Sequence, residues 1–516
     1  MTEHRHVNPW IVAIAVMFGT FMEVLDTTVV NVSLPHIAAT MSATIDEATW
    51  VLTSYLVANA IILPMTGWLA STFGRKRVLM MSVTGFTITS FLCGIAPNLG
   101  SLIAFRILQG ATGGALQPLS QAILLESFQP HERGKAMGFW GLGIVVAPIL
   151  GPVVGGWLTE TYSWRWVFYI NLPVGIASIV MTQLFIFDPS YLRRQVERVD
   201  YWGIGMLVVG IGSLQYVLDK GQEADWFASR SILTLSIVSA VTLVVLLYHE
   251  WTTDHPIIDL RVFKERSYAT GVFLMTMLGF VLYGSMVLLP VMLQTVLGYP
   301  AIAAGIAMAP RGMGSLVMMP IVGMLTSKVD VRKLLALGFT VAGVTLIWLG
   351  QLNLQAGYWD IFWPQLLQGT GMALTFVPLT TVAMQAIPPE RMGNATSLFN
   401  LMRNIGGSVG IAVTGTLLVR QRQTVAAVLG ERITAYDPES QTMLAQLKAA
   451  FMARGVDAVT AGERANGALH GILIQQASMV SFVWLFQLLG VIFLLLLPLI
   501  LIMRRPKGRV SAAAAH

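Results

Sequence analysis

Cysteine and charge are both scarce in this 516-residue chain. The single cysteine, Cys93, lies inside an apolar run, so no disulfide can form within the chain and we expect a small packing residue there. Charged residues make up 11% of the sequence and hydrophobic residues 55%, with a mean hydropathy of +0.69. These proportions exclude an ordinary soluble protein.

Patterns that indicate catalysis are also missing. The sequence has no cluster of metal ligands, no nucleotide-binding loop and no nucleophile beside a partner base. We therefore expect neither an enzyme nor a bound metal or cofactor. The formal charge of +6 does not predict a nucleic-acid partner, because the basic residues are placed as in membrane proteins.

Apolar runs of about 17–25 residues follow one another along the chain, each long enough to cross a lipid bilayer. Backbone polar groups must be paired inside lipid, so runs of this length indicate helices. The sequence predicts an all-α polytopic membrane protein with about fourteen spanning helices. We expect these helices at 11–34, 48–70, 78–96, 100–123, 136–158, 166–186, 202–218, 232–249, 269–290, 301–325, 334–351, 360–384, 397–419 and 479–503.

Lysine and arginine concentrate on one side of these expected helices. That side holds the clusters Arg75 to Arg77, Arg193 and Arg194, and Arg504 and Arg505, whereas the short connections on the other side hold few basic residues. Cytoplasmic loops of membrane proteins carry this excess. The sequence therefore predicts a protein of the inner (cytoplasmic) membrane with both termini in the cytoplasm.

Three segments of the first half recur in the second half, in the same order and at nearly the same offset, which indicates a duplication. The pairs are Gly67–Leu79 with Gly323–Leu335, Leu108–Gly113 with Leu367–Met372, and Pro130–Arg133 with Pro388–Arg391. We expect two six-helix bundles with a site between them and two helices inserted in the linker. The predicted boundaries are 1–190 for the first bundle, 191–266 for the insert, and 267–516 for the second bundle with an outer loop at 420–478.

Glu23 and Asp26 are two carboxylates near the middle of the first apolar run. Ionisable residues at this depth are costly and usually functional, and their spacing places both on one helix face. Burial favours the neutral carboxyl group, so Asp26 is the expected main proton site. Glu23 could bind cationic compounds, carry a second proton or only line the cavity. Alternatively, Asp26 is locked in place by hydrogen bonds to Thr27, Asn31 or a neighbouring helix.

Arg106 in the fourth run is the expected counter-charge of Asp26, because an unpaired guanidinium at that depth is costly. The pair could form and break as a two-state switch, or Arg106 could simply hold two helices together. Its counterpart in the second half is Gln365, so the duplicate has lost the charge. Arg311 and Arg403 also lie in apolar runs, where structural and functional roles are both open.

A substrate cavity between the bundles would be lined by polar and adaptable side chains, which suit amphipathic ligands. Aromatic residues at helical spacing are, however, more often core or lipid-facing than ligand-binding. The candidate cavity residues are Glu23, Asn31, Tyr55, Gln109, Gln117, Tyr283, Gln294, Gln365, Phe376 and Arg403.

Four motifs give the chain a family resemblance. They are Leu25–Pro35 in the first helix, Gly67–Arg77 after the second, Arg106–Gly110 in the fourth, and Gly143–Pro148 with Gly151, Pro152, Gly155 and Gly156 in the fifth. In these motifs the chain resembles the major facilitator superfamily, and within it the fourteen-helix drug:proton antiporters of the EmrB/QacA type. The resemblance extends over essentially the whole chain.

The resemblance implies efflux of amphipathic drugs or toxic compounds, and hence antibiotic resistance, by alternating access with the proton gradient as driving force. It implies gating for Gly67, Gly74, Arg75, Lys76 and Arg77, although Ser71 stands where the family motif often has an acid. It implies antiport and prevention of leak for Pro148, Gly151, Pro152, Gly155 and Gly156. Two alternatives remain: a dedicated transporter of one metabolite, siderophore or lipid, and a membrane receptor or scaffold without transport.

The segment 420–478 is too polar to lie in a membrane. Asp437, Pro438 and Glu439 predict the start of a helix, and Gly455 predicts its end. Met443, Leu444, Leu447, Phe451 and Met452 form an apolar face on this helix. By the family resemblance, that face could bind an EmrA-like periplasmic adaptor that feeds an outer-membrane channel, or it could fold over its own transporter.

Overall fold

The structure is a computed structural model that describes residues 8–188, 199–253, 256–431, 433 and 437–503. Every regular element in these residues is helical, as predicted. In chain order they are α1 (Pro9–Thr40), α2 (Ile45–Phe73), α3 (Arg75–Gly94), α4 (Leu99–Gly113), α5 (Leu116–Ser127), α6 (Arg133–Thr161), α7 (Trp166–Tyr169), α8 (Asn171–Phe185), α9 (Tyr201–Lys220), η1 (Trp226–Ala228), α10 (Arg230–Thr252), η2 (Leu260–Lys264), α11 (Arg266–Thr295), α12 (Ala301–Leu325), α13 (Val331–Leu349), α14 (Tyr358–Gln385), η3 (Pro389–Arg391), α15 (Met392–Gly430), α16 (Pro438–Ala453), α17 (Ala458–Leu495) and η4 (Leu497–Ile502). Arg193, Arg194, Arg504, Arg505 and the predicted boundary at 190/191 lie outside the described residues.

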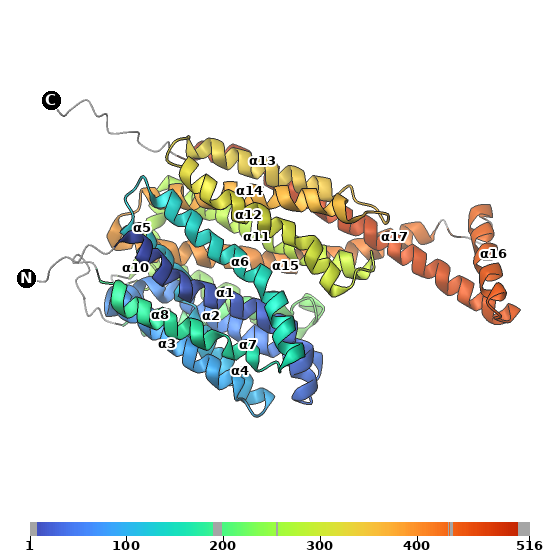
Figure 1. The fold of residues 1–516 in the computed structure, drawn as a ribbon, viewed down its shortest axis with the longest axis horizontal. Coiled ribbons are helices and arrows are strands. Elements are labelled where there is room, and N and C mark those ends of the chain that lie inside the picture. The colour runs from blue at the N-terminus through green and yellow to red at the C-terminus, as the bar shows by residue number, and fades with distance from the viewer. Residues whose placement is uncertain (1–7, 189–198, 254–255, 432, 434–436, 504–516) are drawn as a thin grey trace, which may run out of the picture.

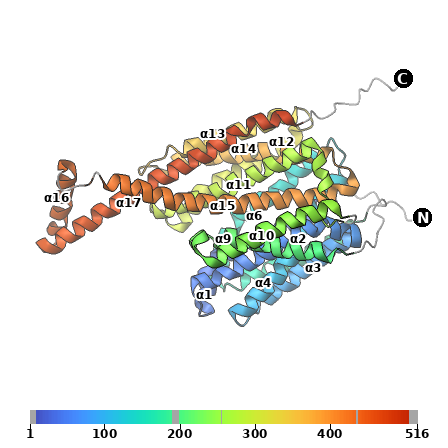
Figure 2. The same cartoon turned by 180° about the vertical axis from the view of Figure 1, so that it is seen from behind.

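Helices α1–α8 form one bundle and α11–α15 with α17 form the other, and α9 runs beside α2 with α10 packed against α9 (Figures 1 and 2). The start of α1 and the end of η4 lie at one end of this assembly, the terminal side, and α16 projects from the opposite end, the far side (Figure 1). The inserted helix α9 contacts both bundles. Thr53 of α2 donates a hydrogen bond to Asp219 of α9, and Gln215 of α9 donates to Ser408 of α15 at 3.0 Å.

Twelve helices of the described residues are long and apolar enough to cross a membrane. The other two of the fourteen predicted spans fall on α15, which is more polar, and on the run 100–123, which is broken into α4 and α5. Pro118, four residues after Gly114, has no backbone donor for the Gly114 carbonyl, which interrupts the helix here. The glycines beside the break pack closely on α2: a Cβ on Gly110 would lie 2.3 Å from Tyr55 O, and one on Gly114 would lie 2.7 Å from Asn59 O. The number fourteen therefore stays a prediction.

The outer segment is more helical than predicted. Residues 420–430 continue α15, and α17 already begins at Ala458, because these stretches are polar but rich in helix-forming residues. The helix predicted from Asp437 is confirmed as α16, with Asp437 accepting a hydrogen bond from Ser440 N at 2.9 Å. Hydrogen bonds from Ser440 hold the pKa of Asp437 below its usual value. Gly455, which was predicted to end this helix, lies just after its last residue, Ala453, and has φ of +87°, a conformation that glycine tolerates.

The two bundles touch on the terminal side. Arg75 Nη2 donates to Pro389 O at 3.2 Å, and Thr396 Oγ1 donates to Pro118 O at 3.1 Å. A Cβ on Gly138 of α6 would lie 2.6 Å from Met319 O of α12. Among the described residues, the hydrogen bonds and close glycine contacts between the bundles are confined to the helix halves nearest the terminal side. This arrangement is closed toward the terminal side.

Candidate functional site

Asp26 of α1 lies at the centre of a fully buried polar cluster in the first bundle. Arg106 Nη1 donates to Asp26 Oδ2 at 2.6 Å, and the amides of Gln109 and Asn171 donate to Asp26 Oδ1 at 3.1 and 2.7 Å. All four side chains are 0% exposed. We call Asp26, Arg106, Gln109 and Asn171 the Asp26 cluster. It joins helices α1, α4 and α8 through one ion pair and two amides.

Arg106 is held from several directions. Its Nε donates to Val51 O at 3.0 Å, its Nη1 also donates to Gln109 Oε1 at 2.9 Å, and its Cζ lies 4.1 Å from the ring centre of Tyr55. A guanidinium over an aromatic face gains further stabilisation where water is excluded. Two of these contacts, with Val51 and Tyr55 of α2, do not depend on the charge of Asp26. Arg106 thus forms an ion pair with Asp26, and its role as a counter-charge in proton coupling stays a prediction.

Glu23, one helical turn from Asp26, belongs to a second polar chain that reaches the other bundle. Asn59 Nδ2 donates to Glu23 Oε1 at 3.1 Å, and Gln117 Nε2 donates to Glu23 Oε2 at 2.7 Å. Arg403 Nη2 of α15 donates to Gln117 Oε1 at 2.6 Å. We call Glu23, Asn59, Gln117 and Arg403 the Glu23 relay. It brings together three of the predicted cavity residues, since Glu23, Gln117 and Arg403 now form one connected chain.

The predicted gating motif lies at the terminal-side contact. Arg75 forms an ion pair with Glu126 of α5 and also donates to Pro389 O, and Lys76 N donates to Asp188 Oδ1 at 2.8 Å. Gly74 has φ of +91°, which favours glycine. A Cβ on Gly67 would lie 2.6 Å from the Cα of Asn394, so this glycine allows α2 and α15 to touch. Arg77 is exposed.

The fifth-helix motif packs α6 directly onto α1. A Cβ on Gly151 would lie 2.0 Å from Thr28 Oγ1, and a Cβ on Gly155 would lie 3.0 Å from Val29 O. Gly156, in the same motif, has nothing within 4 Å of its Cβ position. Pro148 and Pro152 lie inside the helix, where each removes a backbone donor. Gly151 and Gly155 therefore allow close approach to the helix that carries Asp26, whereas Gly156 does not contribute to it.

This difference predicts the effect of adding one methyl group to each glycine. Gly151→Ala forces Thr28 to move and is expected to destabilise the protein by about 1–3 kcal/mol, as overpacking does. Gly156→Ala meets open space and is expected to leave the thermal unfolding midpoint unchanged or slightly raised. Thermal unfolding of the two purified variants in the same detergent measures this. Equal midpoints would contradict the packing role assigned to Gly151.

Other predicted cavity residues are dispersed. Asn31 and Gln294 are exposed, and Tyr283 packs against Gly407 within the second bundle. Phe376 stacks on Trp140 of the first bundle with ring centres 6.1 Å apart, at the contact between the bundles. Gln365 is 1% exposed and donates to Gln368 Oε1 at 3.2 Å. Among the described residues, no hydrogen bond joins any of these to the Glu23 relay.

Several site residues were missed at the level of sequence. Asn59 and Asn171 hold the two carboxylates, and Glu126 supplies the carboxylate that the gating motif lacks at Ser71. The only available signal was a lone amide inside each apolar run, which is common in membrane helices. Glu126 lies near a helix end, where an acid is unremarkable.

A sequence model of the Major Facilitator Superfamily matches residues 16–411. The chain belongs to the Major Facilitator Superfamily. It is 38% identical over 500 residues, 96% of each chain, to the "Multidrug export protein EmrB" of Escherichia coli (strain K12). It is 37% identical over 500 residues, again 96% of each chain, to the "Fatty acid resistance protein FarB" of Neisseria gonorrhoeae. Major facilitator proteins are transporters, so this chain is a multi-pass membrane transporter rather than an enzyme.

Solved structures agree on the fold. The proton:xylose symporter XylE, a major facilitator protein, superposes with a TM-score of 0.59 at 16% identity and covers 94% of each chain. The human organic anion transporter MFSD10 superposes with a TM-score of 0.60 at 13% identity, covering 96% of this chain and all of that one. The predicted major facilitator fold is confirmed.

Proposed function

We propose that this transporter exports amphipathic drugs or other toxic compounds across the inner membrane in exchange for protons, with both of its termini in the cytoplasm. Relatives that match almost the whole chain are named multidrug export proteins, which supports the substrate class. The fully buried Asp26, in the middle of a spanning helix, carries the proposal of proton coupling. An acid in the membrane is expensive and is retained for a function.

Asp26 is the proposed proton carrier. When ionised, it accepts hydrogen bonds from Arg106, Gln109 and Asn171. Protonation turns one carboxyl oxygen into a donor and removes the attraction to Arg106. Arg106 keeps its bond to Val51 O and its contact with Tyr55, so it can separate from Asp26 without losing every partner. The first bundle then has two arrangements, and the proton decides between them.

The Glu23 relay would pass this change to the second bundle. Two ionised carboxylates one turn apart repel each other, so a proton on Asp26 favours an ionised Glu23. Glu23 holds Gln117, and Gln117 accepts from Arg403 of α15. Protonation of Asp26 therefore changes the strength of the contact that Gln117 and Arg403 make between the two bundles. Alternating access would follow as the terminal-side contacts, including Arg75 with Pro389, open and close.

Transport by the purified protein in liposomes tests this proposal. With an acidic lumen, we expect uptake of fluorescent amphipathic compounds that stops when a proton ionophore collapses the gradient. Compound uptake that is the same with and without the pH gradient would contradict proton coupling. Failure of every compound in a broad panel to move would contradict export and favour a receptor or scaffold.

A dedicated exporter of one compound class is the second candidate. The observation that favours it is the name of FarB, a relative connected with resistance to fatty acids. The same panel separates the two candidates, since a dedicated exporter moves one chemical class and a multidrug exporter moves several.

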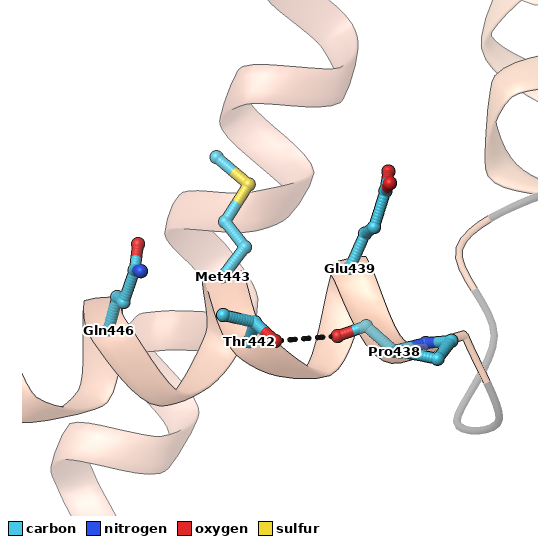
Figure 3. A pocket seen from close by; sticks show the side chains of 5 residues that line it. All are labelled: Pro438, Glu439, Thr442, Met443 and Gln446. Atoms are coloured by element: carbon cyan, nitrogen blue, oxygen red, sulfur yellow. Dashed lines mark hydrogen bonds between the residues drawn. The ribbon is translucent and has the colours of Figure 1, made fainter.

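We also propose that α16 is the docking site for an EmrA-like adaptor, through which compounds reach an outer-membrane channel. Helix α16 projects from the bundles, and Leu444, Leu447 and Phe451 are partly buried where α16 packs against α17. Met443 and Met452 of the same apolar face stay exposed, at 37% and 46%. Figure 3 shows a shallow surface pocket whose lining side chains are Pro438, Glu439, Thr442, Met443 and Gln446.

Met443→Lys is expected to weaken binding of a purified EmrA-like adaptor roughly tenfold or more, because it places a charge in the apolar centre of the contact. Thr424→Lys adds the same charge at an exposed position of α15, outside α16, and should bind like the unaltered protein. Surface plasmon resonance with the transporter in nanodiscs measures both. If the two variants bind equally, this face is not the contact.

A further inference from the structure

Arg311 of α12 is a partly buried cation that forms no ion pair with any of the described residues. Its Nη2 atom is buried and has no hydrogen-bond partner among the described residues, and none of the ion pairs in that part of the chain includes it. Arg311 lies ten residues into a spanning helix that begins at Ala301, or about 15 Å from its far-side end. This depth is the middle of a hydrocarbon core of about 30 Å.

The side chain of Arg311 points away from lipid. The exposed apolar residues of α12 form one stripe, which contains Ile302, Ile306, Met313, Val317 and Met324. Arg311 belongs to the opposite stripe, four residues from the buried Ala307 and four from the buried Ser315. Arg311 itself is partly exposed. Because its stripe faces the protein interior, this exposed part borders the interior and not the bilayer.

The second bundle offers Arg311 no counter-charge. Its six helices contain two carboxylates, Asp360 and Glu463, and both lie near far-side helix ends. The deep carboxylates of the protein, Glu23 and Asp26, belong to the first bundle and are already bound to amides or to Arg106. A buried charge that lacks a partner is strongly destabilising, so an uncompensated arginine here needs an anion from elsewhere.

A neighbouring side chain on α14 is also incompletely bonded. Gln365 is 1% exposed, and its Oε1 has no partner among the described residues. Gln365 lies one turn from Gly369, whose Cβ position is 1.9 Å from Arg311 O, so both residues lie at the α12–α14 contact. Helical side chains lean toward the helix N-terminus, which brings Arg311 toward the level of Gln365. On the two sides of this contact, Arg311 Nη2 and Gln365 Oε1 both lack a hydrogen-bond partner among the described residues.

We propose that Arg311 binds the anionic head group of amphipathic substrates, beside the contact between α12 and α14. A carboxylate, sulfonate or phosphonate accepts the planar pair of guanidinium donors, and the apolar tail lies along the apolar helix surfaces. This inference rests on the proposed function, which it narrows to a substrate class. Glu23 on the facing bundle would favour cationic groups instead, so the two bundles supply opposite charges to the space between them.

Two probes with the same alkyl chain test the proposal: decanesulfonate and decyltrimethylammonium, each charged at every working pH. Calorimetry on the protein in nanodiscs measures binding, and proteoliposomes with a pH gradient measure transport. Arg311→Gln is expected to weaken decanesulfonate binding about tenfold or more, and to change decyltrimethylammonium binding by less than about twofold. Arg311→Lys should recover part of the sulfonate binding, because a point charge replaces the planar donor pair.

Arg230→Gln is the matched control, since it removes the same charge from an exposed position at the far-side start of α10. It should bind both probes like the unaltered protein. Thermal unfolding separates binding from structure: removal of an unpaired buried charge should not lower the midpoint. A lower midpoint with equal loss of both probes, or unchanged sulfonate binding in Arg311→Gln, overturns the inference. Binding of both probes without gradient-driven transport contradicts the proposed function and leaves the anion site supported.

Discussion

Asp26→Asn is expected to reduce proton-driven export to background while the protein stays folded. The amide is nearly the same size and can still bond Gln109 and Asn171, but it cannot carry a proton or attract Arg106. Substrate exchange without a gradient should persist, because exchange needs alternating access and no net proton movement. Proteoliposome uptake with and without a pH gradient measures both activities.

Glu250→Gln is the matched control for this change. Glu250 is a buried acid of the inserted helix α10, 4% exposed, and its Oε2 accepts from Ile258 N at 3.0 Å, a bond that an amide oxygen can keep. Its gradient-driven uptake should equal that of the unaltered protein. Glu23→Gln should fall between the two, because its amide keeps one of the two acceptor oxygens that Glu23 offers to Asn59 and Gln117 and loses the charge. Full gradient-driven uptake by Asp26→Asn would show that another group carries the proton.

The ion pair between Asp26 and Arg106 was predictable because charge is so rare in the membrane. Asp26 and Arg106 stand out in apolar runs, and their cost when unpaired predicts that they meet. The sequence did not predict which other residues surround these charged side chains. Asn171 and Asn59 are small amides on other helices, and whether they reach a carboxylate depends on helix rotation and tertiary packing that no spacing rule gives.

For the fold, too, some features were predictable from the sequence and others were not. Long apolar runs located most helices, but not where they end, because polar residues such as Arg420 to Gln423 form helix as readily as apolar ones. The close packing of Gly110 and Gly114 on the backbone of α2 is a contact set by the partner helix, which the sequence of the run 100–123 does not give. The closed terminal side is likewise a property of the two bundles together.

Arg106→Gln is expected to lower the free energy of unfolding by about 3–5 kcal/mol at neutral pH, because it leaves the ionised Asp26 buried without its counter-charge. The double variant Asp26→Asn with Arg106→Gln removes both charges and should recover most of this loss, since neutral polar groups replace the pair. Thermal unfolding of the two single variants and the double variant completes the cycle. The double variant should still fail to couple export to protons.

The pH dependence separates the charge of Arg106 from its other contacts. In Arg106→Gln, lowering the pH lets Asp26 take up a proton, which removes the uncompensated charge, so the variant should approach the unaltered protein in stability as the pH falls. The hydrogen bond to Val51 O and the contact with Tyr55 are lost at every pH. Their loss accounts for the part of the stability that is not recovered at low pH. A deficit that is the same at all pH values would mean that these contacts, and not the ion pair with Asp26, are what Arg106 contributes.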